Sequence, residues 1–181
     1  FDNEEVGSET KQGAASTLLR DVLERISAAL GGTAETLRRQ IAGSFLVSCD
    51  NAHAVHPNHP EYGDKTHPVR LNGGVVLKHN AAQRYTTDAV SGAVFRSVCA
   101  AAGVPVQDYV NRPDIAGGST LGNIANTQVS LNTADIGLGQ LAMHSAFETA
   151  GAADTAYLVR ALKAFFETPL RMERDGVYRL A

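Results

Sequence analysis

Short apolar segments alternate along this chain with longer segments whose apolar residues recur at helical spacing. Because strands that alternate with helices pack in layers, we predict an α/β sandwich around a mostly parallel sheet. In such sheets, ligands gather at the carboxyl ends of the strands. Asp50 stands at one such end, and we expect Glu4 and Glu5 to follow another. The predicted strands cover residues 45–49, 75–77, 106–110 and part of 129–138.

The predicted helices cover residues 13–30, residues 33–42 with Thr33 as the cap, a segment that begins at Thr86 or Thr87 and ends before Gly103, and residues 154–167. Helical spacing places one set of apolar residues from each long helix in the core. For the first helix these include Leu18, Leu19, Val22, Leu23, Ile26 and Leu30, and for the last helix Leu158, Val159, Leu162, Phe165 and Phe166. Residues 51–73 are polar and are predicted to form a long loop.

The 181 residues are enough for one domain with a core of its own. A net charge of −3 without a basic patch argues against a nucleic-acid partner, and no apolar run is long enough to span a membrane. The two cysteines, Cys49 and Cys99, lack paired spacing. We expect buried, reduced thiols, which favours a cytoplasmic protein.

Two adjacent carboxylates, Glu4 and Glu5, lie between an apolar residue and a Gly-Ser turn signal near the start of the chain. Side chains next to each other on an extended segment point in opposite directions, but at an irregular strand end both can border one cavity. One carboxylate would then bind a metal while its neighbour moves a proton. The alternative is ordinary exposed surface charge.

A second cluster, Asp50 with His53 and His56, follows a predicted buried strand. Carboxylate oxygens and imidazole nitrogens are the usual ligands of catalytic zinc. The alternative is an aspartate cap at a strand–loop junction with histidines that only form hydrogen bonds. We expect His59, His67 and His79 to be solvent-exposed.

Three further residues are candidates for a site. His144 follows a Gly-rich turn and is either a metal ligand or a buried core histidine. Lys78 and Tyr85 flank a polar stretch between a strand and a helix. They either bind a substrate anion or serve as a solvated amine and a half-buried phenol. The Gly-rich segment 116–122 could present backbone N–H groups to an anion, but it is not a P-loop, because no Gly-Lys-Ser/Thr follows.

Five segments, taken in their order along the chain, resemble the aspartyl aminopeptidase family of dinuclear zinc exopeptidases. They are FDNEEVGS, SCDNAHAVHPN, VVLKHNAAQRYTTDA, RPDIAGGSTLG and GLGQLAMHSAFE. The resemblance extends from residue 1 to about residue 168. It implies a three-layer α/β/α zinc-exopeptidase-like sandwich with a mostly parallel mixed sheet. It also implies removal of N-terminal residues, often aspartate or glutamate, from peptides.

The resemblance implies a role for each matched residue. Glu4 resembles the general base that activates water, Glu5 a ligand of one zinc, and Asp50 a ligand of the other zinc. His144 resembles the last histidine ligand, and Lys78 and Tyr85 resemble residues of the substrate pocket. No ligand role is carried over to His53 or His56. The expected cofactor is a pair of zinc ions, although the same ligands accept manganese or cobalt.

The family's first histidine ligand and its bridging aspartate have no counterpart in these residues. We therefore expect residues 1–181 to be the carboxyl-terminal part of a single metallopeptidase catalytic domain, with its amino-terminal portion missing and little activity alone. The full-length protein is expected to form a homo-oligomer. The alternatives are a zinc aminopeptidase of neutral or broad specificity and a non-catalytic α/β fragment. A nucleotide-binding domain is disfavoured, because no GxGxxG follows a strand.

Overall fold

A mixed four-stranded sheet forms the centre of the protein in the computed structural model, which describes residues 1–180. Its strands are β1 (Phe45–Cys49), β3 (Val75–His79), β4 (Val106–Val110) and β5 (Asn132–Gly137), in the order β1-β5-β3-β4. The β1–β5 and β3–β4 pairs are parallel, and the β3–β5 pair is antiparallel. Parallel pairs therefore outnumber the antiparallel pair, as the predicted fold class requires.

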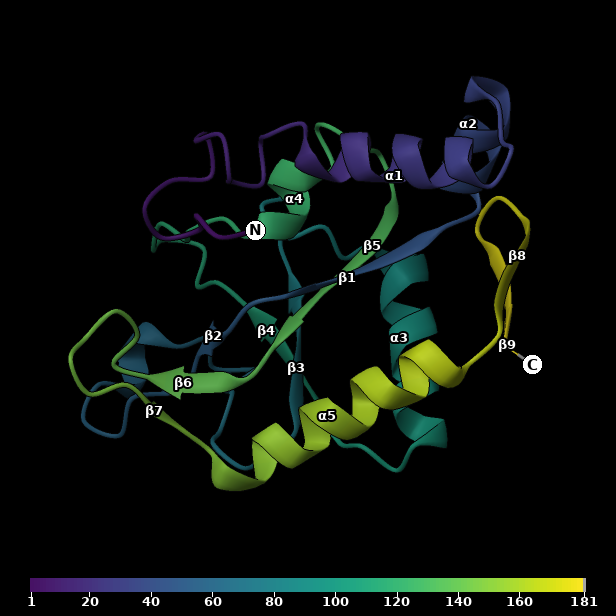
Figure 1. Ribbon diagram of the computed structural model, residues 1–181. Coiled ribbons are helices and arrows are strands. Elements are labelled where there is room, and N and C mark those ends of the chain that lie inside the picture. Colours follow the sequence, from purple (N-terminus) through teal and green to yellow (C-terminus); the bar gives the residue numbers. More distant parts are fainter. Residues whose placement is uncertain (181) are drawn as a thin grey trace.

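Helices cover both faces of this sheet (Figure 1). On one face, α3 (Ala89–Ala101) and α5 (Ala152–Glu167) contact each other and pack against the central strands. Alternate strand residues point into this layer and pack against side chains of α3 and α5 to form the main core. The fully buried residues of this core are Val75, Leu77, Ala134 and Ile136 from the strands and Phe95, Cys99 and Ala161 from the helices. The other face, under α4 (Leu121–Ala125), receives the intervening side chains, which include Ser48, Lys78 and Asp135. This second face is polar and leads to the cavity that holds the candidate site.

The remaining elements lie around the sheet. Helices α1 (Leu18–Ala29) and α2 (Ala34–Ala42) contact each other, and α1 lies on the same side of the sheet as α4 (Figure 1). Strands β2 (Ala52–His53), β6 (Gly139–Leu141) and β7 (Thr149–Ala150) form a small sheet, while a 3-10 turn, η1, covers Pro60–Tyr62. A hairpin of β8 (Leu170–Arg174) and β9 (Val177–Leu180) follows α5.

Several elements confirm the sequence predictions, and others correct them. Strands β1, β3 and β4 lie where they were expected, and Thr33 caps α2 through a hydrogen bond from the Thr36 N–H. Helix α3 is capped by Asp88, not by Thr86 or Thr87, because the Asp88 carboxylate and Ser91 form a reciprocal capping box. The first helix begins at residue 18, five residues later than predicted. The β8–β9 hairpin was not predicted.

The predicted inward faces of two helices were partly wrong. On α1, Leu19 and Leu23 are half-buried, but Leu18, Val22, Ile26 and Leu30 are exposed. On α5, Val159 and Phe166 are exposed in the same way. Of the two cysteines, Cys99 is buried as predicted and Cys49 is exposed, and both are free thiols.

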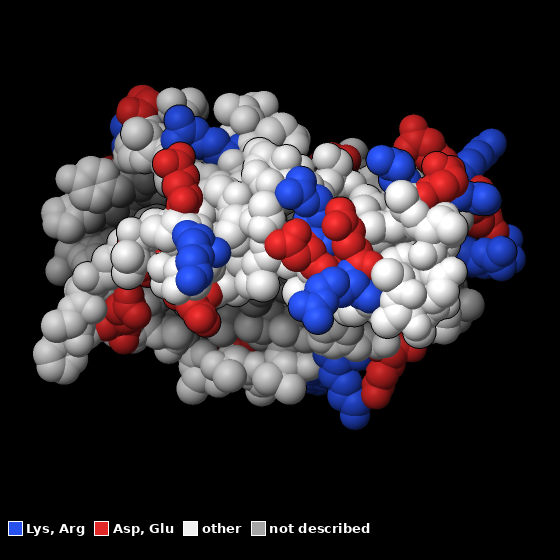
Figure 2. Space-filling view, turned by 45° about the horizontal axis from the view of Figure 1, so that its top comes forward, with Lys and Arg blue, Asp and Glu red and all other residues white. Residues whose placement is uncertain are grey.

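The charged side chains are mixed on the surface. On the face in Figure 2, acidic and basic side chains lie interleaved, so that face has no broad basic patch of the kind that binds nucleic acid. Within residues 1–180, none of the helices has the length and apolar character needed to cross a membrane.

Candidate metallopeptidase site

One cavity of about 750 Å³ brings together all six residues predicted to form the site: Glu4, Glu5, Asp50, Lys78, Tyr85 and His144. They come from distant parts of the chain. The glutamates lie in the irregular segment before α1, Asp50 lies in the β1–β2 turn, and His144 follows β6. Lys78 belongs to β3, and Tyr85 precedes α3. A common cavity argues against the alternative in which these residues are unrelated surface groups.

Glu5 and His144 are in direct contact. The His144 Nε2 lies 3.0 Å from the Glu5 Oε1, and both side chains are accessible from the cavity. His144 has a φ of +68°, a left-handed conformation that is uncommon outside glycine, and its N–H donates to the Glu148 carboxylate. Two ligands of one tetrahedral zinc lie about 3.3 Å apart. The Glu5–His144 pair therefore has a spacing that fits two ligands of one metal ion.

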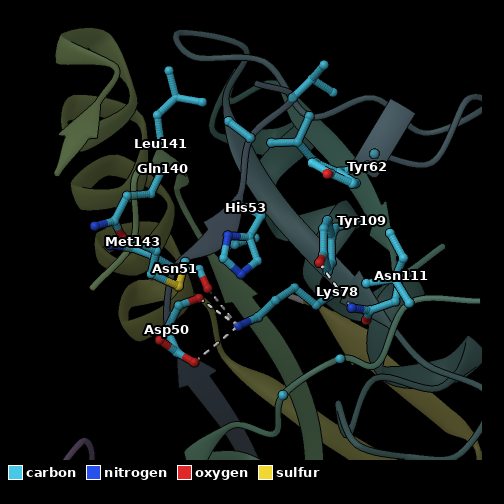
Figure 3. A pocket seen from close by; sticks show the side chains of 18 of the residues that line it. Asp50, Asn51, His53, Tyr62, Lys78, Tyr109, Asn111, Gln140, Leu141 and Met143 are labelled. Atoms are coloured by element: carbon cyan, nitrogen blue, oxygen red, sulfur yellow. Dashed lines mark hydrogen bonds and ion pairs between the residues drawn. The ribbon is translucent and has the colours of Figure 1, made fainter. Parts of the chain in front are cut away.

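Asp50 is held by Lys78 (Figure 3). The Lys78 Nζ donates to the Asp50 carbonyl oxygen at 2.7 Å and lies 3.5 Å from its carboxylate Oδ2. The lysine is only 1% exposed, and its ammonium also lies 3.8 Å from the Oδ1 of Asp135, which is fully buried. One buried cation thus connects the predicted metal ligand Asp50 with a second carboxylate inside the sheet.

Asp135 was not singled out from the sequence. Its carboxylate accepts hydrogen bonds from the Ser48, Thr86 and Thr120 hydroxyls. Burial raises the pKa of Asp135, while the ammonium of Lys78 acts in the opposite direction. The one available signal was a lone carboxylate inside the apolar strand Asn132–Gly137, which requires a buried partner.

Glu4 is placed beside the other carboxylates of the cavity. Partial burial, followed by the negative charges of Asp50 and Glu5, raises the pKa of Glu4 above its usual range. A general base needs a pKa that approaches the working pH, because only then does it both accept and return a proton efficiently. The environment of Glu4 therefore suits proton transfer.

His53, a candidate ligand from its sequence cluster with Asp50, also lines the cavity, as do Tyr109 and Asn111, for which no site role was predicted. Burial lowers the pKa of His53. The Asn111 Nδ2 donates to the Tyr109 hydroxyl at 3.2 Å (Figure 3). The ring centroids of Tyr85 and Tyr109 lie 6.0 Å apart. Tyr109 lies in β4 and Asn111 directly follows that strand, in a sequence context that carried no distinctive motif.

His56, His59 and His67 are exposed, as predicted for His59 and His67, and all three border the same cavity. His79 is half-exposed at the end of β3, where its Nε2 lies 3.1 Å from the Asp108 carboxylate. Within residues 1–180, no three His, Cys, Asp or Glu side chains come together in a geometry that would hold a metal ion. The described residues therefore fit part of a metal site, namely the Glu5–His144 pair with Asp50 nearby.

Comparison with known proteins places these residues in a wider context. The family model described as "Aminopeptidase I zinc metalloprotease (M18)" matches residues 1–166. A protein of Clostridium novyi (strain NT) called "Probable M18 family aminopeptidase 2" is 49% identical over 166 residues, which are 92% of this chain and 38% of that protein. A "Probable aspartyl aminopeptidase" of Ricinus communis is 44% identical over 167 residues, 92% of this chain and 34% of that protein.

Solved structures agree with this result. The dodecamer of mApe1 from S. cerevisiae superposes with a TM-score of 0.80 at 33% identity, and the match covers 92% of this chain and 36% of that one. The similarity bears out the α/β exopeptidase fold. The chain spans little more than a third of the length of these relatives.

Proposed function

Because the chain belongs to the M18 family of zinc aminopeptidases, we propose that the full-length protein removes N-terminal residues from peptides in a zinc-dependent reaction. The observation that carries this proposal is the shared cavity, in which Glu5 and His144 lie 3.0 Å apart and Glu4 and Asp50 stand close by. We further propose that acidic N-terminal residues are preferred. The name of the Ricinus communis relative supports this preference, whereas the Lys78 ammonium is buried and already faces Asp50 and Asp135.

In this proposal, Glu5 and His144 bind one zinc ion and Asp50 binds the other. The family resemblance implies two further ligands, a histidine and a bridging aspartate, which we propose lie elsewhere in the full-length protein. When bound, the zinc ions supply Lewis-acid polarisation of the scissile carbonyl and lower the pKa of water. Manganese or cobalt would fit the same types of ligand. Without the additional ligands, the 181-residue chain alone would bind metal weakly and show little activity.

The protein's own groups perform the proton transfers. Glu4 accepts a proton from the attacking water, and the upward direction of its pKa shift supports this role. It then returns the proton to the leaving peptide nitrogen. Lys78 fixes the Asp50 main chain through the 2.7 Å hydrogen bond to its carbonyl oxygen. Tyr85, which is buried beside Lys78, closes the floor of the substrate pocket.

We also propose that the full-length protein assembles as a homo-oligomer. The similarity to yeast mApe1, whose solved structure is a dodecamer, supports this assembly. A cytoplasmic location remains an expectation from the two free thiols.

The direct test is hydrolysis by the full-length protein of peptides that differ only in an N-terminal Asp or Leu, before and after removal of metal with a chelator. We expect cleavage from the amino end, a higher kcat/KM for the Asp peptide, and recovery of the lost activity when zinc is restored. Equal rates on the two peptides would favour a neutral or broad aminopeptidase. A lack of hydrolysis by the metal-loaded full-length protein would favour a non-catalytic α/β protein.

A further inference from the structure

Three aromatic rings form a continuous stack on the rim of the cavity. The ring centroids of His56 and His59 lie 5.5 Å apart with an interplanar angle of 37°. Those of His59 and Tyr62 also lie 5.5 Å apart, with an angle of 30°. All three residues line the cavity that holds the site. We call His56, His59 and Tyr62 the aromatic rim.

The aromatic rim is held in place by hydrogen bonds within its own loop. The His59 and Tyr62 N–H groups donate to the carbonyl oxygens of His56 and His59, respectively, and the His59 Nδ1 lies 3.0 Å from the Glu61 carboxylate. Arg112, from beyond β4, donates to the Glu61 carbonyl oxygen. Rings that are already ordered lose little conformational entropy when a ligand binds, so a fixed stack is a favourable binding surface.

The depth of the cavity indicates which part of a peptide would reach the aromatic rim. The floor is buried, with Tyr85 at 6% exposure and Lys78 at 1%, whereas Tyr62 is 64% exposed. Figure 3 shows Tyr62 and Tyr109 along one wall, with the Lys78 ammonium directed toward Asp50. An enzyme that removes one N-terminal residue must enclose that residue and let the rest of the chain leave through the open end. The residue after the scissile bond would therefore pass the aromatic rim.

We propose that the aromatic rim binds the side chain of the second residue of the peptide and favours an aromatic side chain there. Planar rings at these spacings attract a further ring in an offset or tilted arrangement. The inference rests on the proposed aminopeptidase function and adds a preference on the leaving side of the scissile bond. It does not involve the residues assigned to metal binding or proton transfer.

The test compares kcat/KM of the full-length, zinc-loaded protein for Asp-Phe-Gly and Asp-Ala-Gly. We expect the Phe peptide to be favoured about two- to tenfold, as aromatic pairs contribute on this scale. Tyr62→Ala should remove most of that ratio. Tyr62→Phe keeps the ring and should keep the ratio. Phe166→Ala is the matched control, because Phe166 is an aromatic residue with 80% exposure that lies outside the cavity lining.

The outcomes separate this inference from the proposed function. Hydrolysis of both peptides without a preference for Phe, or with a preference that survives Tyr62→Ala, would overturn the aromatic subsite and leave the aminopeptidase function intact. Equal loss of activity on both peptides in Tyr62→Ala, with a change in oligomer size by gel filtration, would instead assign the rim to subunit contacts. Absence of hydrolysis of either peptide by the wild type would overturn the function itself.

Discussion

The His144 Nε2 lies 3.0 Å from the Glu5 Oε1, although the two residues are separated by 139 positions in the chain. The contact joins the segment before α1 to the turn after β6. Both residues were predicted as metal ligands from their separate motifs, and the fold brings them to the spacing expected for one ion. The candidate site therefore depends on the packing of the whole chain as well as on its own side chains.

Replacing the predicted general base should stop turnover without removing the metal. Glu4→Gln keeps the size of the side chain but cannot accept a proton. We expect kcat of the full-length protein to fall by about 10²–10⁴-fold. Zinc content should stay at the wild-type level, because Glu4 is not a proposed ligand. Normal turnover in this variant would rule out the assignment.

Removing the buried cation should destabilise the protein strongly. Lys78→Met leaves the Asp135 carboxylate without its counter-ion in a fully buried position. We expect a loss of about 3–5 kcal/mol in the free energy of unfolding, measured with urea.

The double variant Lys78→Met/Asp135→Asn should lose less than Lys78→Met alone, because no unpaired buried charge remains. Lys163→Met, in an exposed pair with Glu167, is the control and should change stability by less than about 1 kcal/mol. Additive losses in the double variant would argue against the buried pair.

A methyl group at residue 137 should displace Asp50. The Cβ of an alanine at Gly137 would overlap the Asp50 carbonyl oxygen, the same atom that accepts the hydrogen bond from Lys78. For Gly137→Ala we expect a loss of at least about 1–3 kcal/mol in unfolding free energy, together with a lower zinc content in the full-length protein. Gly43→Ala meets only ordinary contacts and serves as control. Wild-type stability and zinc content in Gly137→Ala would show that the close approach is not required.

The reactivity of Cys99 should depend on pH in a defined way. Burial raises the pKa of the Cys99 thiol to about 11, so at pH 8 about one thiol in a thousand is ionised. In the native protein, alkylation by iodoacetamide should therefore rise about tenfold per pH unit up to that value, from a very low rate at pH 8. Cys49 is the internal comparison in a mass-spectrometric map: burial of its thiol also raises its pKa, but the residue is exposed and should therefore react first. Equal labelling of both thiols at pH 8 in the folded protein would contradict this account.

Local patterns predicted β1, β3 and β4 well, because β1 and β3 begin with short apolar runs and turn-forming residues precede all three strands, although β4 itself contains Gln107 and Asp108. The same patterns did not predict which apolar residues of α1 and α5 are exposed. Leu18 and Phe166 continue a helical apolar spacing, yet tertiary contacts leave them exposed. The β8–β9 hairpin was not predicted, although Leu170 and Met172 alternate with the charged residues Arg171 and Glu173 and are the less exposed residues of that stretch.

For the site, the order of the motifs identified residues that a single motif could not. The contact between Glu5 and His144 depends on the path of the whole chain, so no local pattern contains it. The burial of Lys78 follows from the antiparallel pairing of β3 with β5, which places it beside Asp135. From sequence alone, a lysine is expected to be exposed to solvent, so the buried contacts of Lys78 with Asp50 and Asp135 were not predicted.

The most direct test of the account is the zinc content of the purified full-length protein, measured beside His144→Ala and His79→Ala. His79 lies outside the cavity lining and controls for the general loss of a histidine. We predict that the wild type and His79→Ala hold about two zinc ions per chain and that His144→Ala loses at least one, with loss of Asp-peptide hydrolysis. Equal zinc in all three proteins, or no zinc in the wild type, would contradict the assignment of Glu5 and His144 as a metal-binding pair.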